Sequence, residues 1–205
     1  MKKIVFSDKF KLTYSVLNGC KTQFRCVVPN HVISKIINEF KGDYYEKTLD
    51  TISDIELINH YYFTEKLAKA PYTIEEKLAV AQTYESIIND EVFSIRYQFL
   101  LEEIPGWKDN KRVKAEKMPH QITITDVRIE KLQDISDSDC LKEGVKQIIL
   151  GDDKKGFVTA YGYKATKEIW FTPREAFIQL INKVHRNNVW KENPYVFVFD
   201  FILDE

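Results

Sequence analysis

Residues 121–132, with the sequence QITITDVRIEKL, alternate apolar and polar side chains, which predicts a β-strand. The apolar positions are Ile122, Ile124, Val127 and Ile129, so the alternation slips by one residue near Asp126. A slip of this kind is typical of a β-bulge, in which one strand carries an extra residue. We therefore expect one long strand with a single irregularity.

Three further segments are predicted to be extended. Residues 193–203, NPYVFVFDFIL, are strongly β-prone, and residues 77–84, KLAVAQTY, are short enough to form a buried strand. Residues 157–163, FVTAYGY, are expected to form a strand or an extended segment.

The longer helix predictions depend on apolar residues at helical spacing. This spacing predicts a short helix over 7–19, helices over 30–42 and 85–103, and a helical elaboration at about 44–70.

Cap motifs mark two more helices. Residues 136–145, SDSDCLKEGV, predict a capped helical turn that ends at Gly144. Thr172, Pro173 and Glu175 fit the N-cap, N1 and N3 positions of a capping box before a longer helix.

Strands scattered among helices of unequal length indicate an α+β fold with a small mixed or barrel-like sheet. A regular βαβ array is not indicated. No glycine-rich phosphate loop accompanies a predicted strand, which argues against nucleoside-triphosphatase and dinucleotide-binding functions. No repeat or linker divides the chain, so we expect one domain over 1–205 that carries the helical elaboration.

Charge and composition restrict the function classes. Thirty basic and 31 acidic residues give a net charge of -1, which excludes the uniform positive field of a protein that coats nucleic acid. Three cysteines without CxxC spacing indicate reduced thiols. The four histidines show no metal-ligand spacing, so we expect neither a metal nor a cofactor.

The N-terminal residues MKKIVFSDKF contain too short an apolar run for a signal peptide, and no run in the chain is long enough to span a bilayer. We therefore expect a soluble, cytoplasmic protein without a membrane partner.

Residues 17–29, LNGCKTQFRCVVP, form the strongest site candidate. A glycine, a lysine, a hydroxyl and an arginine fall within seven residues, and apolar β-formers follow. In a regular strand Thr22 and Phe24 would lie on one face and Lys21 and Arg25 on the other. A site that uses all four side chains therefore needs a turn after Gly19.

The succession of these motifs along the chain resembles the ASCH domains of the PUA-like superfamily, in particular a group common in phage and prophage-rich genomes. The most specific parts are ITITDVRIEKLQDIS and NPYVFVFDF, and the resemblance covers nearly the whole chain. It implies a small mixed PUA-like β-barrel decorated with helices, with a cleft beside the glycine and lysine segment. It also implies binding of RNA or modified nucleosides, and some small members of the family remove the acyl group from acylated cytidine.

The family pattern transfers only in part. Gly19 and Lys21 match its glycine and lysine, but Phe24 stands where the family has threonine and Cys26 where it has arginine. Arg25 supplies a guanidinium one position early, and Gln82 replaces the acidic residue that the resemblance leads us to expect. Since phenylalanine cannot act as a nucleophile and glutamine cannot take a proton near neutrality, these departures weaken the case for hydrolysis.

Three functions remain open. The first is a non-catalytic protein that binds RNA or a nucleotide derivative, with ligand-binding candidates Lys21, Thr22, Phe24, Arg25 and Gln82. The second is an amidohydrolase for N-acylated nucleosides that uses Lys21 and Thr22. The third is a protein-interaction module in which the helical elaboration binds the partner. Against all three, Lys21 and Arg25 could be exposed strand-end charges, and Phe24 and Gln82 ordinary core residues.

The most basic local stretch of the chain, GWKDNKRVKAEKMPH, is a second candidate for contact with nucleic acid. Its side chains could also form an ordinary solvated surface. The residues concerned are Trp107, Lys108, Lys111, Arg112, Lys114 and Lys117.

Overall fold

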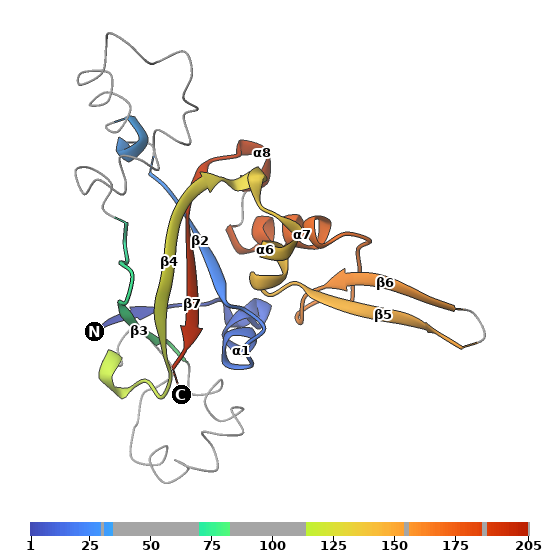
Figure 1. Ribbon diagram of the computed structural model, residues 1–205, viewed down its shortest axis with the longest axis horizontal. Helices are drawn as coiled ribbons and strands as arrows, with labels where there is room; N and C mark the ends of the chain where they lie inside the picture. Colours follow the sequence, from blue (N-terminus) through green and yellow to red (C-terminus); the bar gives the residue numbers. More distant parts are fainter. Residues whose placement is uncertain (30, 35–69, 83–113, 154–155, 186–187, 205) are drawn as a thin grey trace.

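A computed structural model of the chain describes residues 1–29, 31–34, 70–82, 114–153, 156–185 and 188–204. Five strands form one sheet in the order β1-β3-β4-β7-β2 (Figure 1). In this sheet β1 and β3 run parallel, and the other neighbouring strands run antiparallel. The strands are β1 Lys2–Ile4, β2 Gln23–Val27, β3 Lys77–Val80, β4 Gln121–Lys131 and β7 Tyr195–Leu203.

Short helices accompany this sheet, and α7 is the longest of those that the structure describes. The mixed α+β fold with a sheet core that the sequence predicts is confirmed. Among the described strands the sheet is open, with β1 and β2 as its two edges. The helices are η1 Asp8–Phe10, α1 Leu12–Leu17, η2 Ala115–Lys117, η3 Leu132–Asp134, α6 Asp137–Lys142, α7 Pro173–His185 and α8 Val189–Glu192.

The irregularity predicted in β4 is confirmed. The register between β4 and β7 shifts between Ile124 and Asp126, as expected of a bulge. Before the shift Ile122 and Ile124 are buried, and after it Val127 and Ile129 are buried. The apolar side of the strand therefore continues across the bulge.

The sheet buries apolar side chains on both faces. Phe197, Phe199 and Phe201 of β7 belong to one core, which also contains residues of α1, β1 and β3. Val196 and Val198 of the same strand belong to a second core with residues of α6, α7 and α8. This double burial explains why residues 193–203 are almost continuously apolar.

Both cap predictions are confirmed. The hydroxyl of Ser136 accepts a hydrogen bond from the Asp139 backbone N–H at the start of α6. At α7 the Thr172 hydroxyl accepts from the Glu175 backbone N–H, and the Glu175 carboxylate accepts from the Thr172 backbone N–H, both at 3.2 Å. This reciprocal pair is the capping box.

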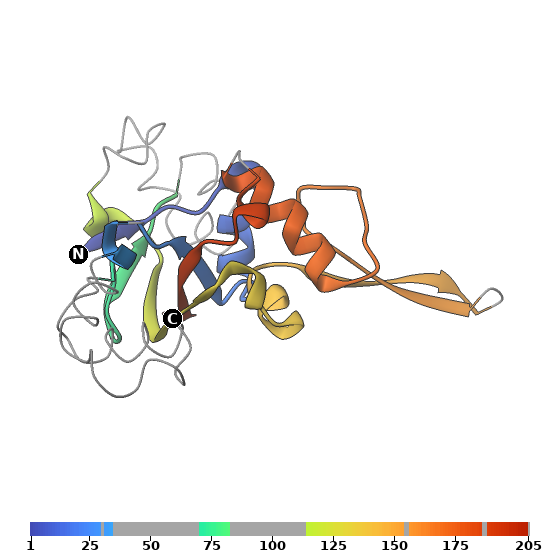
Figure 2. The same ribbon diagram turned by 90° about the horizontal axis from the view of Figure 1, so that it is seen from above.

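A two-stranded hairpin, β5 Lys146–Asp152 and β6 Gly156–Gly162, extends away from the five-stranded sheet (Figures 1 and 2). The strand expected over 157–163 is confirmed as β6. β5 was not predicted, because its three consecutive apolar residues, Ile148–Leu150, do not alternate with polar ones.

Several predictions fall on segments that the structure does not describe. These are the helical elaboration at 44–70, apart from Ala70, the helix over 85–103, and most of the helix over 30–42, of which residues 31–34 are described and helical.

Candidate functional site

The turn that a site around Lys21 requires is present. Gly19 follows the end of α1 with φ +64°, a left-handed conformation that glycine adopts without steric cost. The backbone N–H groups of Cys20 and Lys21 then both donate to the carbonyl oxygen of Ser15, at 2.8 and 2.9 Å. The chain reverses here, and β2 begins at Gln23.

Lys21 forms a buried ion pair with Glu143, which follows α6. The lysine Nζ lies 2.5 Å from Oε2 of Glu143 and 3.0 Å from the carbonyl oxygen of the same residue. An isolated antiparallel bridge joins the two backbones, and both residues are at most 5% exposed. Gly144, at φ +101°, turns the chain away directly after the pair.

Arg25 binds the second oxygen of the same carboxylate. Its Nη1 lies 2.8 Å from Oε1 of Glu143 and also donates to the Gln23 side chain, while its Nη2 lies 2.7 Å from Oε1 of Glu130. Both carboxylate oxygens of Glu143 therefore accept from buried cations.

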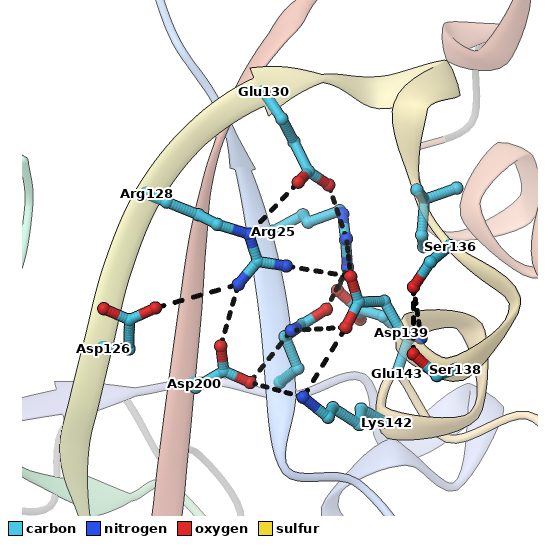
Figure 3. A network of polar contacts seen from close by, with 12 residues as sticks. Arg25, Asp126, Arg128, Glu130, Ser136, Ser138, Asp139, Lys142, Glu143 and Asp200 are labelled. Atoms are coloured by element: carbon cyan, nitrogen blue, oxygen red, sulfur yellow. Dashed lines mark hydrogen bonds and ion pairs between the residues drawn. The ribbon is translucent and has the colours of Figure 1, made fainter. Parts of the chain in front are cut away.

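This cluster extends to a second, more exposed arginine, Arg128 (Figure 3). Arg128 donates to Asp139 and to Asp200, each at 2.9 Å, and to Glu130 at 3.2 Å. Gln23 links Asp139 and Asp200 by donating to both. The cluster thus contains about as many carboxylates as cations. Its positive charges are therefore largely balanced by negative ones.

Burial and charge act in opposite directions on the two cations. Burial lowers the pKa of Lys21 below its usual value, although Glu143 opposes this shift. Burial also acts to lower the pKa of Arg25, but the nearby carboxylates of Glu143 and Glu130 outweigh it and raise that pKa. Of these two cations, Lys21 therefore loses its proton more readily than Arg25.

A pocket of about 270 Å³ borders this ion pair. The end of β1, the start of α1, the edge strand β2 and the second half of α7 form its walls. Its surface is mostly apolar, with the aromatic rings of Phe6, Phe24, Tyr72 and Phe177. Lys21, Arg25 and Glu143 supply a polar end.

The position of β2 at the edge of the sheet explains how this pocket is built. Lys21 and Arg25 reach the charged cluster, whereas Phe24 lies in the apolar core and stacks on Phe199 with 4.8 Å between ring centroids. Alternation along the segment is therefore maintained. All three residues still line one pocket, because side chains from both faces of an edge strand can border a cavity beside it.

Two of the predicted ligand-binding residues lie away from this pocket. Thr22 is half-buried, and its backbone exchanges hydrogen bonds with Lys142 and Phe201. Gln82 is fully buried after β3, and neither polar atom of its side chain has a hydrogen-bond partner among the residues that the structure describes. Neither residue lines the pocket beside Lys21. The alternative that Lys21 and Arg25 are exposed charges is wrong, since both are buried.

The basic loop is described only at its end. Lys114 and Lys117 are exposed: Lys114 directly precedes η2, and Lys117 is the last residue of this helix, which buries Ala115. The other four candidates of that loop, Trp107, Lys108, Lys111 and Arg112, lie outside the described residues.

Glu143 is the main site residue that the sequence did not reveal. It lies 122 positions from Lys21, and the sequence around it carries only a helix-end signal at Gly144. Cys26 also lines the pocket, and burial raises the pKa of its thiol to about 11, so it is a poor nucleophile near neutrality.

Within the described ranges, no group of three or more His, Cys, Asp or Glu side chains is arranged to hold a metal ion. The same part of the chain contains no helix that is both long and apolar enough to cross a membrane. Comparisons with protein-family models, with curated proteins and with solved structures find no match to this chain.

Proposed function

We propose that the chain binds a small nucleoside-like ligand, a nucleoside or another nucleotide derivative, in the pocket beside Lys21. The proposal agrees with the resemblance to ASCH domains, which implies a PUA-like fold and binding of RNA or modified nucleosides. The observation that carries it is the combination of aromatic walls with one buried polar end in a single pocket. Aromatic surfaces hold a base by its face, and fixed polar groups select its edge.

The volume of the pocket supports a small ligand. At about 270 Å³ it lies near the lower limit of roughly 300–1,000 Å³ that is typical of ligand sites. A single nucleoside is a better match to this volume than an oligonucleotide.

The ion pairs favour an uncharged ligand over a phosphate. Lys21 and Arg25 both bind Glu143, and Arg25 also binds Glu130, so two carboxylates compensate the two positive charges. Donors that remain for a ligand include the third N–H of Lys21 and Nε of Arg25, which is buried and has no hydrogen-bond partner among the described residues. Carbonyl oxygens or ring nitrogens of a base would accept from them.

Titration with nucleosides, nucleotides and short single-stranded RNA, followed by NMR or calorimetry at low and high salt, tests this proposal. We expect nucleosides to bind with an affinity that changes little with salt, and an added phosphate to give no gain. Strongly salt-dependent binding of RNA alone would indicate phosphate recognition instead. No binding of any compound would overturn the proposal.

A matched pair of variants locates the binding site. Val184→Trp places a large ring at a pocket-lining position and should abolish binding. Lys183→Trp adds the same ring at the neighbouring exposed position of α7 and should bind as the parent does. Equal binding by both variants would place the ligand elsewhere.

Hydrolysis of N-acylated nucleosides is a second candidate, which the buried Lys21 favours. Burial lowers the pKa of Lys21 and so favours its neutral form, which can take a proton from the attacking water and return it to the leaving amino nitrogen as the acyl carbon–nitrogen bond breaks. Release of a carboxylate from N-acylated cytidine, lost in Lys21→Met but kept in Lys183→Met, would support it. No release from a broad panel of acylated nucleosides would remove it.

A further inference from the structure

The hairpin of β5 and β6 has apolar side chains on both faces, although it extends away from the main sheet (Figure 2). Ile149 is 67% exposed and Phe157 62% exposed on one face, and Val158 is 54% exposed on the other. Two-stranded hairpins are marginally stable alone in water, and exposed apolar surface of this kind marks interaction sites.

The outer edge of β5 is the open edge of this hairpin. Among the described residues β5 pairs with β6 only, whereas the base of β6 is also bridged to Trp170 through Tyr161 by two 2.8 Å backbone hydrogen bonds. Edge strands are usually protected from pairing by proline, by bulges or by charges in their centre. The centre of β5, Ile148–Leu150, has none of these.

We propose that β5 pairs antiparallel with β5 of a second copy of this chain, with Ile149 at the two-fold axis. The sequence of the strand, KQIILGD, is complementary to itself in this register. Lys146 then faces Asp152 of the partner subunit at each end, and Ile148 faces Leu150 of the partner subunit in the centre. The four strands form one continuous sheet through an interface that uses the same patch of both copies.

The surface available indicates a weak dimer that depends on concentration. The two exposed apolar side chains of β5, Ile149 and Leu150, offer on the order of 200 Å² per copy. A stable interface of standard size buries roughly 800 Å² per partner, so this contact depends on the backbone hydrogen bonds along the β5 edge as well as on these side chains. We therefore expect dissociation at roughly micromolar to millimolar concentrations.

Sedimentation velocity of the full chain over this concentration range gives the first test. We expect a reversible monomer–dimer equilibrium in the parent. Ile149→Lys brings two like charges together at the axis and should abolish the dimer. Thr159→Lys adds the same charge on β6 opposite Ile149, one strand away from the contact, and should preserve it.

Charge reversal then tests the register. Lys146→Asp places acidic groups opposite one another at both ends, and Asp152→Lys places basic groups there. Each variant alone should dimerise about tenfold more weakly than the parent. A mixture of the two variants restores opposite charges at both ends and should form a heterodimer. The double variant Lys146→Asp/Asp152→Lys should recover the affinity of the parent.

A parent chain that stays monomeric at all concentrations overturns the proposal. A dimer that persists in Ile149→Lys also overturns the proposal. A dimer whose affinity does not change with the charge reversals overturns the proposed register of the two strands. Far-UV circular dichroism of every variant verifies that the fold is retained. Nucleoside binding is measured separately, so failure of the dimer leaves the proposed function testable.

Discussion

Nζ of Lys21 lies 2.5 Å from Oε2 of Glu143 in the interior of the protein, although 122 positions separate the two residues. The same carboxylate accepts from Arg25 at 2.8 Å. A lysine from the turn before β2 and an arginine from β2 are thus held by one acidic residue that follows α6.

Removal of the charge at Glu143 should strongly destabilise the fold. Glu143→Gln leaves Lys21 and Arg25 buried with less compensating charge, and breaking a buried pair costs about 3–5 kcal/mol. Urea denaturation measures this loss as a lower free energy of unfolding.

The control for this change is an exposed ion pair. Lys183 and Glu168 lie 3.1 Å apart with both side chains at the surface, so Lys183→Met should cost about 0–1 kcal/mol. If Glu143→Gln costs no more than this control, the buried pair does not stabilise the fold.

Phe24 should be essential for folding and not merely for binding. It stacks on Phe199 and also contacts the rings of Phe6, Tyr72 and Phe201. Phe24→Ala should cost about 3–5 kcal/mol by leaving a cavity. Phe171→Ala removes the same ring from an exposed position and should change the free energy of unfolding by about 0.5 kcal/mol or less. Equal effects would contradict the packing described.

The capping box of α7 should contribute measurably to stability. Thr172→Ala removes the hydroxyl that accepts from the Glu175 backbone N–H and should cost about 1 kcal/mol. Glu175→Gln retains an acceptor for the Thr172 N–H and should cost less. Thermal denaturation of the two variants compares them, and the reverse order would argue against the reciprocal bonds.

Two cysteine thiols should make stability fall at alkaline pH. Burial raises the pKa of Cys26 from 9.0 to about 11 and that of Cys140 from 9.0 to about 12. Since both are raised in the folded state, their stabilising effect is complete below pH 9 and is lost as the pH rises through those values. Unfolding measured across this range should show a smaller alkaline loss in Cys140→Ala.

Thiol labelling provides an independent measurement of the same shifts. A rise from 9.0 to about 11 lowers the thiolate fraction about 100-fold, so Cys26 should react slowly with iodoacetamide in the folded protein. Cys20, in the turn after α1, should react first. Rapid labelling of Cys26 in native protein would contradict the raised pKa of its thiol.

Features encoded by neighbouring residues were predictable from the sequence. The bulge of β4 follows from the spacing of Ile124 and Val127, and the capping box of α7 from Thr172 and Glu175. The turn at Gly19 was predicted as a condition for the site. Each of these depends on a backbone preference or on a short-range hydrogen bond.

Features that depend on distant pairing were not predictable in this way. Nothing in the sequence near Lys21 indicates that Glu143 reaches it, because that contact depends on how α6 packs beside β2. Strand order likewise places β2 at the sheet edge, which allows Lys21, Phe24 and Arg25 to share a pocket despite their alternation. Only the family resemblance indicates Gln82 as a site residue, and its side chain does not line that pocket.

The bulge in β4 also decides which residues meet Arg25. Without the bulge, regular alternation of the same residues would turn the even-numbered positions toward the apolar core along the whole strand, and Arg128 and Glu130 would be directed into it. Deletion of Thr125 would instead remove the extra residue and leave Val127 and Ile129 on the apolar side by ordinary alternation. The direction of Glu130, the acidic partner of Arg25 on this strand, thus depends on a shift of the alternation by a single residue.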